Sequence, residues 1–270
     1  ALYQWSSQKV PPPFKPVVWV IVLALPALQW WSNRERVDQS ENYLAHDYTQ
    51  NILANVEPNA FILTYQWDYF VSASYYFQHV RRQRPDVVII DKELLRRSWY
   101  YLMLERNYPW LIERSKVKVD LFLAELYKFE HGLPLDPAVI EARFNEMIND
   151  FIDRAMEERP VYVGNEIEPQ FAYTYQRIPE GLLFRLLREN ETPTIKPATV
   201  SFRPTTFEND YTRGIKFLYA RMLTMNAALM MEQHQAALAL DAVEQALEID
   251  STFPPAHELQ KQLREQQSSK

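Results

Sequence analysis

The apolar segment Phe14–Trp31 is the feature that most constrains what this chain can fold into. It reads FKPVVWVIVLALPALQWW, in which Lys15 is the single charged residue. A helix that spans a bilayer needs about 20 apolar residues, with a range of about 17–25, so this segment is at the short end of that range. Trp19, Trp30 and Trp31 belong to a residue type that is enriched at membrane interfaces. The segment therefore predicts one transmembrane helix, over about residues 14–31.

Two other interpretations of this segment are open: a buried core helix and the apolar centre of a signal peptide. The residues WWSNRER end and follow the apolar run, and they contain no small-residue cleavage site, which argues against a signal peptide. Charge does not indicate an orientation, because lysines precede the segment and arginines follow it. Residues 9–16, KVPPPFKP, are typical of a rigid extended lead-in, such as a loop from an earlier span. The chain starts with alanine, which is consistent with a fragment or a processed product.

Composition excludes several classes of site. Apolar residues make up 47% of the chain, enough for a substantial core, and the net charge of −6 argues against a nucleic-acid partner. The absence of cysteine rules out disulfides and thiolate metal sites. The four glycines are too far apart for a Gly-rich phosphate loop, and no two of the five histidines have metal-ligand spacing on one helix face. We therefore expect no cofactor and no metal.

Residues 40–200 have the pattern of an α/β domain. A predicted helix at about 40–56, with Ser40 as its N-cap, is followed by strand 60–65, helix 69–82, strand 87–91 and helix 92–105. Strands that alternate with helices favour a small, mostly parallel sheet with flanking helices. Both strands are continuously apolar, as in a sheet that is covered on both faces. Further on we expect helices at 118–130 and 137–158, the latter with Asp136 as N-cap, strand 160–164, a short helix at 168–175, strand 181–187 and a Pro/Thr-rich linker at 190–204.

The C-terminal part of the chain is helical and rich in Ala, Leu, Met and Gln. Small and large residues alternate in it with the spacing of a tetratricopeptide repeat (Leu223, Ala227, Met230, Ala239, Val243 and Ala246). An ordinary helical hairpin is the alternative. The predicted organisation is thus a lead-in and transmembrane helix in residues 1–39, an α/β domain in residues 40–200, and a linker with tetratricopeptide-like helices in residues 201–270.

Candidate ligand-facing residues follow the first two predicted strands. Ligands of open α/β sheets bind beyond the carboxyl ends of the strands. There the sequence has Trp67, Asp68 and Tyr69 after the first strand, and Asp91 and Trp99 after the second. Two carboxylates on neighbouring strands offer a cation site or acid–base chemistry. The alternative is that Asp68 and Asp91 cap the helices that follow them.

A third acidic segment follows the predicted strand at 160–164. Asn165, Glu166 and Glu168 would add carboxylates to the same end of the sheet, or else form an ordinary acidic loop. No serine stands in a nucleophile-elbow motif. The residues themselves define no catalytic set, so the catalytic residues stay unknown.

Four segments together resemble a known family. They are HDYTQNILANVEPNAFILT (46–64), QWDYFVSASYYFQHVRRQRPDVVIID (66–91), LLRRSWYYLML (94–104) and YPW (108–110). Over roughly residues 14–200 the chain resembles the C-terminal extramembrane region of a family of multi-pass membrane proteins. That family is widespread in bacteria as a domain of unknown function, its eukaryotic relatives are protein O-mannosyltransferases that act on plexin-type receptor domains, and its members often end in tetratricopeptide-like helices.

The resemblance implies a GT-C-type glycosyltransferase with many transmembrane helices, a lipid-phosphate sugar donor and an extracytoplasmic active site. The catalytic acidic residue of such enzymes lies in the first extramembrane loop, which this sequence does not contain. Many family members have a Gly-Asp-Asn-Asp-like motif after the first strand. Here that position reads Gln66-Trp67-Asp68-Tyr69-Phe70, which keeps only Asp68.

The resemblance therefore predicts an accessory C-terminal portion of a glycosyltransferase, inactive by itself, with residues 40–270 in the periplasm or lumen. Its expected partners are the membrane, the missing N-terminal transmembrane portion and an acceptor protein. The alternative is a membrane-anchored protein-interaction module with a tetratricopeptide-like tail and no catalytic activity.

Overall fold

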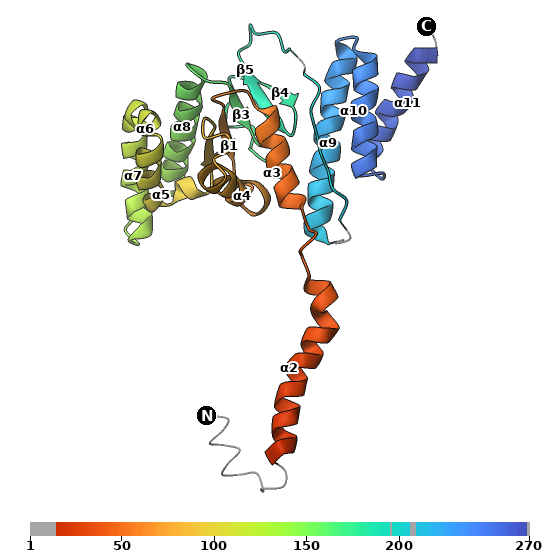
Figure 1. Ribbon diagram of the computed structural model, residues 1–270. Helices are drawn as coiled ribbons and strands as arrows, with labels where there is room; N and C mark the ends of the chain where they lie inside the picture. The colour runs from red at the N-terminus through yellow and green to blue at the C-terminus, as the bar shows by residue number, and fades with distance from the viewer. Residues whose placement is uncertain (1–14, 195, 206–208, 269–270) are drawn as a thin grey trace. The chain divides into compact units, whose positions relative to one another are not determined.

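The computed structural model describes residues 15–194, 196–205 and 209–268 of the chain (Figure 1). The predicted start of the apolar segment at Phe14 and most of the lead-in lie outside these residues. The chain divides into two compact units, residues 1–42 and 43–270.

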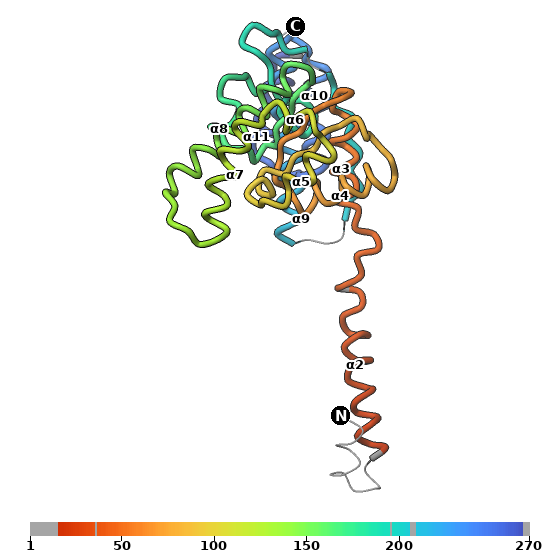
Figure 2. Tube along the Cα trace, turned by 90° about the vertical axis from the view of Figure 1, so that its left-hand side faces the viewer, coloured from red at the N-terminus to blue at the C-terminus, as the bar shows by residue number. Residues whose placement is uncertain are grey.

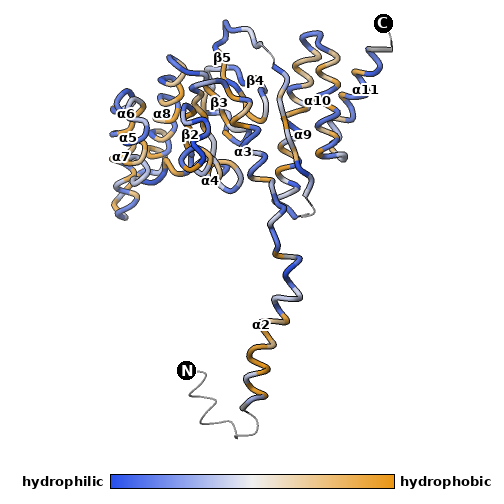
Figure 3. The backbone as a smooth tube through the Cα atoms, in the orientation of Figure 1, coloured by the Kyte–Doolittle hydropathy of each residue, from blue (hydrophilic) through white to orange (hydrophobic). Residues whose placement is uncertain are grey.

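The first unit contains one long helix, α2 (Lys15–Val37), with Pro26 inside it. Its stretch Pro16–Glu35 is long and apolar enough to cross a membrane, and none of it is buried. Figure 3 shows that the apolar residues occupy most of the helix and that its C-terminal end is hydrophilic. The prediction of a helix with the composition of a membrane span is confirmed, by length and composition.

The second unit is built on a five-stranded sheet in the order β2-β1-β3-β5-β4. The three strands β2, β1 and β3 are parallel, whereas β5 runs antiparallel to both β3 and β4. The sheet is therefore mixed, and the prediction of a mostly parallel sheet is wrong for its β5–β4 side. The strands are β1 (Phe61–Thr64), β2 (Val88–Asp91), β3 (Val161–Val163), β4 (Gln176–Glu180) and β5 (Leu183–Leu187).

The strand sequences explain this arrangement. All residues of β1, β2 and β3 are buried, as expected for parallel strands that are covered on both faces. The hairpin of β4 and β5 turns at Gly181, whose φ of 61° is in the left-handed region that glycine adopts most easily. Strand β4 was not predicted, because its sequence QRIPE is polar and contains a proline, which a strand tolerates only at a sheet edge. The short helix predicted at 168–175 is a series of turns instead.

Helices cover both faces of the sheet, with α3 and α9 on one side and α5 to α8 on the other (Figure 1). Helix α3 (Leu44–Asn55) begins four residues after the predicted cap, so Ser40 does not cap it. After β1 the chain forms a π-helical turn η2 (Trp67–Val71), a short α4 (Ser72–Tyr75) and a second π-helical turn η3 (Tyr76–Val80) in place of one regular helix. In the first of these turns the carbonyl of Gln66 accepts from the backbone N–H of both Phe70 and Val71, at 3.1 and 3.0 Å.

The helices after β2 form a group of their own. Figure 2 shows the hairpin of α7 and α8 projecting to one side of this unit. The cap predicted for α8 is confirmed: Asp136 accepts a hydrogen bond from the backbone N–H of Ala138, and Pro137 is the first residue of the helix. The elements are η4 (Leu94–Arg96), α5 (Ser98–Asn107), α6 (Pro109–Arg114), α7 (Lys116–Glu130) and α8 (Pro137–Met156).

The tail consists of α9 (Asp210–Glu232), α10 (Ala236–Ile249) and α11 (Pro254–Ser268). Small residues let these helices approach closely, since Ala227, Ala239 and Ala246 are completely buried among them. The other side of α9 completes the core of the α/β part through Ile215, Tyr219 and Met222. Residues 43–200 and the tail therefore share one compact unit. The helices of the tail are present as predicted, and their tetratricopeptide character stays a prediction.

Candidate functional site

The carboxyl ends of β1, β2 and β3 lie at the same end of the sheet because these strands are parallel. The segments at these ends are residues 65–69, 91–93 and 165–168, of which Asp91 is the last residue of β2, and we call them together the carboxyl rim. Ligands of open α/β sheets bind at such a place. The structure thus brings together the three acidic segments that the sequence singled out.

Glu166 is a carboxylate of the carboxyl rim with one hydrogen-bonded and one shielded oxygen. Its Oε1 accepts hydrogen bonds from the Thr64 hydroxyl at 2.5 Å and from the Tyr65 backbone N–H at 3.0 Å. Its Oε2 is shielded from solvent and has no hydrogen-bond partner among the described residues. Burial raises the pKa of Glu166, although those two hydrogen bonds oppose the rise. A Cβ atom at Gly164 would overlap the Glu166 carboxylate, so glycine at this position leaves room for it.

The Asp91 carboxylate forms hydrogen bonds with the residues that directly follow it in the chain. Asp91 is 1% exposed, and its Oδ1 accepts hydrogen bonds from the backbone N–H groups of Glu93 and Leu94 at 2.8 and 3.0 Å. Burial raises the pKa of Asp91 despite these two hydrogen bonds. The carboxylate therefore caps the turn η4, which is the helix-cap alternative that the sequence left open.

Lys92 is a buried cation that joins two loops of the carboxyl rim. Its Nζ contacts Glu168 Oε1 at 2.7 Å and Glu93 Oε1 at 2.8 Å, and it lies over the rings of Tyr65 and Phe171. Burial alone would lower the pKa of Lys92, but the two carboxylates outweigh it and raise this pKa. The same contact outweighs burial at Glu168 and lowers the pKa of its carboxyl group. Lys92 thus pairs with one carboxylate from its own loop and with one from the loop after β3.

Trp67, Asp68 and Tyr69 lie together on the turn η2. Trp67 is 46% exposed and meets Tyr75 edge to face, while Asp68 is exposed and its backbone carbonyl accepts from the Tyr211 hydroxyl at 3.2 Å. Tyr69 is half-buried, and burial, with the charges of Glu166 and Asp68, raises its pKa to about 12. Asp68 is therefore the open carboxylate of this turn.

Trp99 stands on a different element, near the start of α5, and is 55% exposed. Its ring meets that of Tyr100 edge to face. Tyr100 itself is completely buried, and its hydroxyl accepts from the backbone N–H of Asp91 at 3.1 Å. Trp99 thus lies next to the end of β2, because its neighbour Tyr100 is hydrogen-bonded to Asp91. The Trp99 side chain itself is exposed to solvent.

A second polar region lies away from the carboxyl rim and was not predicted. A cavity of about 370 Å³ is lined there by Arg159, Arg185, Arg188 and Glu180, among others. Arg185 pairs with Glu57 at 2.8 Å and with Glu180 at 3.4 Å. These residues come from β4, β5 and the loops that follow α3, α8 and β5, so their sequence spacing carried no indication of the cavity.

Within the described ranges there is no group of three or more histidine, aspartate or glutamate side chains that could hold a metal ion. The carboxylates of the carboxyl rim are instead committed to backbone groups or to Lys92, apart from Asp68.

The fold and the apolar helix define an α/β protein with one helix that is suited to a membrane. No protein-family model matches the chain, and no solved structure matches it. The chain is similar to "Protein O-mannosyl-transferase TMEM260" of Mus musculus, at 29% identity over 91 residues. The matched stretch covers 34% of this chain and 13% of that protein. This partial match points to a relation between the chain and the O-mannosyltransferases.

Proposed function

We propose that this chain is the C-terminal accessory portion of a membrane-embedded glycosyltransferase that uses a lipid-linked sugar donor. The observation that carries the proposal is the similarity to an O-mannosyltransferase. The helix with the composition of a membrane span supports it, because a lipid-linked donor requires an enzyme at the membrane. In this proposal residues 40–270 lie in the periplasm or lumen.

An accessory role fits the chemistry of the carboxyl rim better than catalysis does. Acid–base catalysis needs a carboxylate within reach of substrate. Asp91 caps a turn, and the oxygens of Glu166 are hydrogen-bonded or shielded from solvent. Asp68 remains open, with the exposed ring of Trp67 beside it in sequence. We assign Trp67, Asp68 and Trp99 to contact with an acceptor polypeptide.

Transfer activity tests this proposal. The reading frame is extended upstream of Ala1, and the longer protein is assayed for transfer from a polyprenyl-phosphate sugar, with and without residues 40–270. We expect transfer by the extended protein, reduced transfer after deletion, and none by the present chain alone. Transfer by the present chain alone would overturn the accessory role.

Point variants locate the contact surface. Asp68→Ala and Trp67→Ala in the extended protein should raise the acceptor KM and leave donor-lipid hydrolysis unchanged. Glu105→Ala, which removes another exposed carboxylate, from helix α5, is the matched control. Equal effects of Asp68→Ala and Glu105→Ala would remove Asp68 from the proposed surface.

A membrane-anchored interaction module without catalytic activity is the second candidate, and the tail favours it. A cavity of about 650 Å³ between α9 and the start of α11 is lined mostly by apolar groups, including Phe217, Met225 and Phe253. Phe217 is 47% exposed at this cavity, and its ring meets that of Phe253 edge to face. Further hydrophobic spans and an early acidic loop upstream of Ala1 would favour the glycosyltransferase. A start codon close to Ala1 would favour the interaction module.

A further inference from the structure

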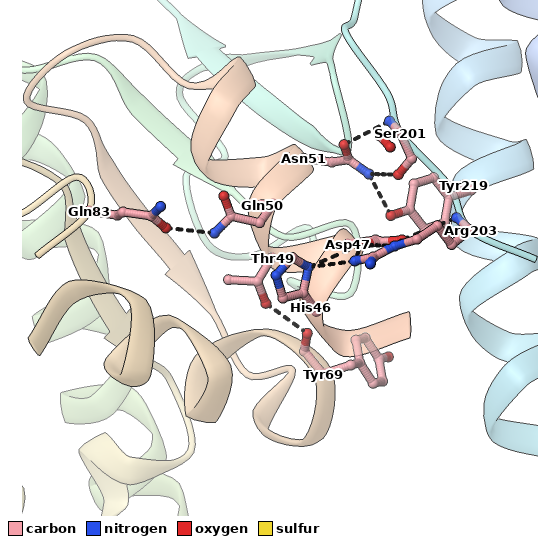
Figure 4. Close-up of polar contacts among 10 residues, drawn as sticks. All are labelled: His46, Asp47, Thr49, Gln50, Asn51, Tyr69, Gln83, Ser201, Arg203 and Tyr219. Carbon is pink, nitrogen blue, oxygen red and sulfur yellow. Dashed lines mark hydrogen bonds and ion pairs between the residues drawn. The ribbon is translucent and has the colours of Figure 1, made fainter. Parts of the chain in front are cut away.

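Helix α3 carries three polar side chains that form hydrogen bonds with the backbone of a segment that is distant in the sequence. Asp47, Asn51 and Asn55 are four residues apart, so they lie along one face of the helix. All three are hydrogen-bonded to an extended part of the linker, residues 199–203, which we call the strap. Figure 4 shows this face of α3, with Asn51 directed at Ser201 and Asp47 at Arg203.

The bonds repeat along the strap with a fixed pattern. Asn55 accepts from the Thr199 N–H at 2.9 Å and donates to the Thr199 carbonyl at 2.8 Å. Asn51 does the same with Ser201, at 2.9 and 2.7 Å. Asp47 accepts from the Arg203 N–H at 3.1 Å. Every second residue of the strap is therefore held by its backbone, and Arg203 is held in addition by its guanidinium, which pairs with Asp47.

The spacing of the polar side chains along α3 matches the spacing of every second residue along the strap. Four residues of an α-helix rise about 6 Å, and two residues of an extended strand rise about 6.6 Å. A side chain at every fourth helical position can thus meet every second residue of any extended polypeptide. The bonds from Asn51 and Asn55 involve no side chain of the strap, so this recognition is independent of sequence at Thr199 and Ser201.

The residues between these positions point inward. Val200 and Phe202 are partly buried and pack against the apolar core, and Phe202 meets Tyr219 of α9 edge to face with ring centroids 5.3 Å apart. The Asn51 amide also donates to the Tyr219 hydroxyl at 2.7 Å, which ties α9 to α3. The inward side chains of the strap therefore pack on an apolar surface to which α9 contributes, and Asn51 links α9 to α3.

Two features show that the strap is held from one side. The Thr199, Ser201 and Arg203 residues are exposed, and Pro197 and Pro204 flank the held residues. The pattern of every second residue would continue at positions 197 and 205, and Pro197 has no backbone N–H with which to extend it. The strap is a short surface segment rather than a strand of the sheet.

We propose that α3 and α9 form a binding site for an extended polypeptide, and that the strap occupies this site until an extended segment of a partner protein, with apolar residues at alternate positions, replaces it. Main-chain hydrogen bonds would supply affinity, and the two inward positions would supply selectivity. The proposal goes beyond the accessory role, because it rests on the contacts that α3 and α9 make with the strap and holds for either candidate function.

A peptide-binding experiment tests the site directly. The tethered strap competes at an effective concentration in the millimolar range, so it must first be weakened. The full chain with Val200→Ser and Phe202→Ser, in detergent, is titrated with a fluorescent peptide of residues 196–205. We expect saturable binding, at least tenfold weaker binding to the unaltered chain, and at least tenfold weaker binding of a peptide with serine at both inward positions.

Asparagine variants give the matched comparison. Asn51→Ala, added to the weakened chain, should lower peptide affinity at least fivefold. Asn149→Ala is the control, because Asn149 on α8 likewise pairs with backbone, accepting from the Ala172 N–H at 2.8 Å, at a separate place. Circular dichroism establishes that each variant is folded. Absence of saturable binding, or equal losses from the two asparagine variants, would overturn the proposal.

If the chain with Val200→Ser and Phe202→Ser fails to fold, hydrogen exchange of the unaltered chain tests the proposal instead. In the unaltered chain, amides of residues 199–203 should exchange at least tenfold faster than those of β1, because the strap opens without unfolding of the sheet. Asn55→Ala should accelerate exchange of the strap and leave β1 unchanged. Exchange of the strap and of β1 at one common rate would show a permanent structural contact and overturn the proposal.

Discussion

At the scale of single residues, Gly164 leaves the space that the Glu166 carboxylate occupies after β3. Gly164→Ala would place a methyl group where the Glu166 carboxylate lies. The side chain can swing away, but the Thr64 hydroxyl and the Tyr65 N–H then lose their acceptor. Unmaking hydrogen bonds to buried groups costs about 1–3 kcal/mol, so we expect a loss of that size in the free energy of unfolding. Chemical denaturation of the detergent-solubilised chain measures it.

Two further variants separate this mechanism from a general effect of alanine. Gly214→Ala is the control, because a Cβ atom there meets nothing within 4 Å and alanine favours the α9 helix. It should leave stability unchanged or raise it slightly. The double variant Gly164→Ala with Glu166→Ala should cost less than the sum of the single changes, because both remove the same hydrogen bonds. Strict additivity would contradict the proposed overlap.

The titration of Glu166 gives a prediction for pH dependence. Burial raises its pKa in the folded state above the unfolded value of about 4.3. Below that value both states are protonated, and the carboxyl has no charge to bury. As the pH rises from about 4 through the folded pKa, the unfolded state ionises first, so this residue progressively destabilises the fold. Glu166→Gln keeps an acceptor for Thr64 and does not titrate, so its stability relative to the unaltered chain should increase with pH.

Glu168→Gln should show the opposite trend. Its contact with Lys92 lowers the pKa of the Glu168 carboxyl in the folded state. Stability from this contact is present above the unfolded pKa and is lost as the pH falls through the folded pKa. The substitution should therefore cost most at neutral pH and least in acid. Urea denaturation of both variants between pH 3.5 and 7.5, a range set by the carboxyl pKa values of about 4, measures the two slopes. Slopes of equal sign would contradict the assignment.

The sequence allowed some of these residue roles to be predicted and hid others. Parallel strands placed Asp68, Asp91 and Glu166 at one end of the sheet, because the carboxyl ends of such strands must coincide. Whether a carboxylate faces solvent or a backbone N–H depends on loop geometry that periodicity does not encode. Asn51 and Asn55 were overlooked because their partners are 150 and 144 residues away. Their spacing along one helix face was the available indication.

At the scale of the elements, helix boundaries depend on caps that can be tested. Asp136 accepts from the Ala138 N–H at 2.9 Å at the start of α8. Loss of such a cap costs about 1 kcal/mol, so Asp136→Ala should lower the free energy of unfolding by about that amount. Ser40→Ala should change it by less than about 0.5 kcal/mol, because α3 starts at Leu44 and Ser40 caps nothing. Thermal unfolding of both variants measures the difference, and equal losses would contradict it.

Elements were predicted well where their own sequence carries a clear signal, such as a short apolar run or a helix cap. Strands β1, β2 and β3 have short apolar runs bounded by turns, and α8 has an aspartate cap followed by proline. Strand β4 was missed because an edge strand needs few apolar residues, and it is defined by its pairing with β5 rather than by its own sequence. The regular helix predicted at 69–82 is divided by two π-helical turns. Spacing of apolar residues in so short a window does not distinguish the two geometries.

At the scale of the whole molecule, the apolar cores belong entirely to residues 43–270. The α/β part and the tail share the first core through α9, so the linker at 190–204 connects parts of one compact unit. Composition suggested a boundary there because Pro and Thr are frequent in linkers. The strap shows how such a segment can instead be held in place, by side chains from a helix far away in the sequence.

The division into two units leads to a prediction about the membrane. No residue of the first unit from Lys15 onward contributes to either core, so a chain that starts at Gln39 should fold. Without α2 it lacks the segment Pro16–Glu35 that is suited to a bilayer. We expect the full chain to stay with membranes after an alkaline wash and the shortened chain to be soluble, with an unchanged circular dichroism spectrum per residue of the second unit.

A substitution inside α2 tests the same prediction without deletion. Leu23 and Leu25 are 69% and 56% exposed near the middle of the helix, so their replacement by arginine disturbs no packing. A charged residue at the centre of a span costs about 2.5–3.5 kcal/mol, and two of them should release most of the chain from the membrane. Replacement of both by alanine is the control and should leave retention unchanged. If the shortened chain or the arginine variant remained with the membrane, residues 43–270 would have to bind the membrane themselves, and α2 would not be the anchor.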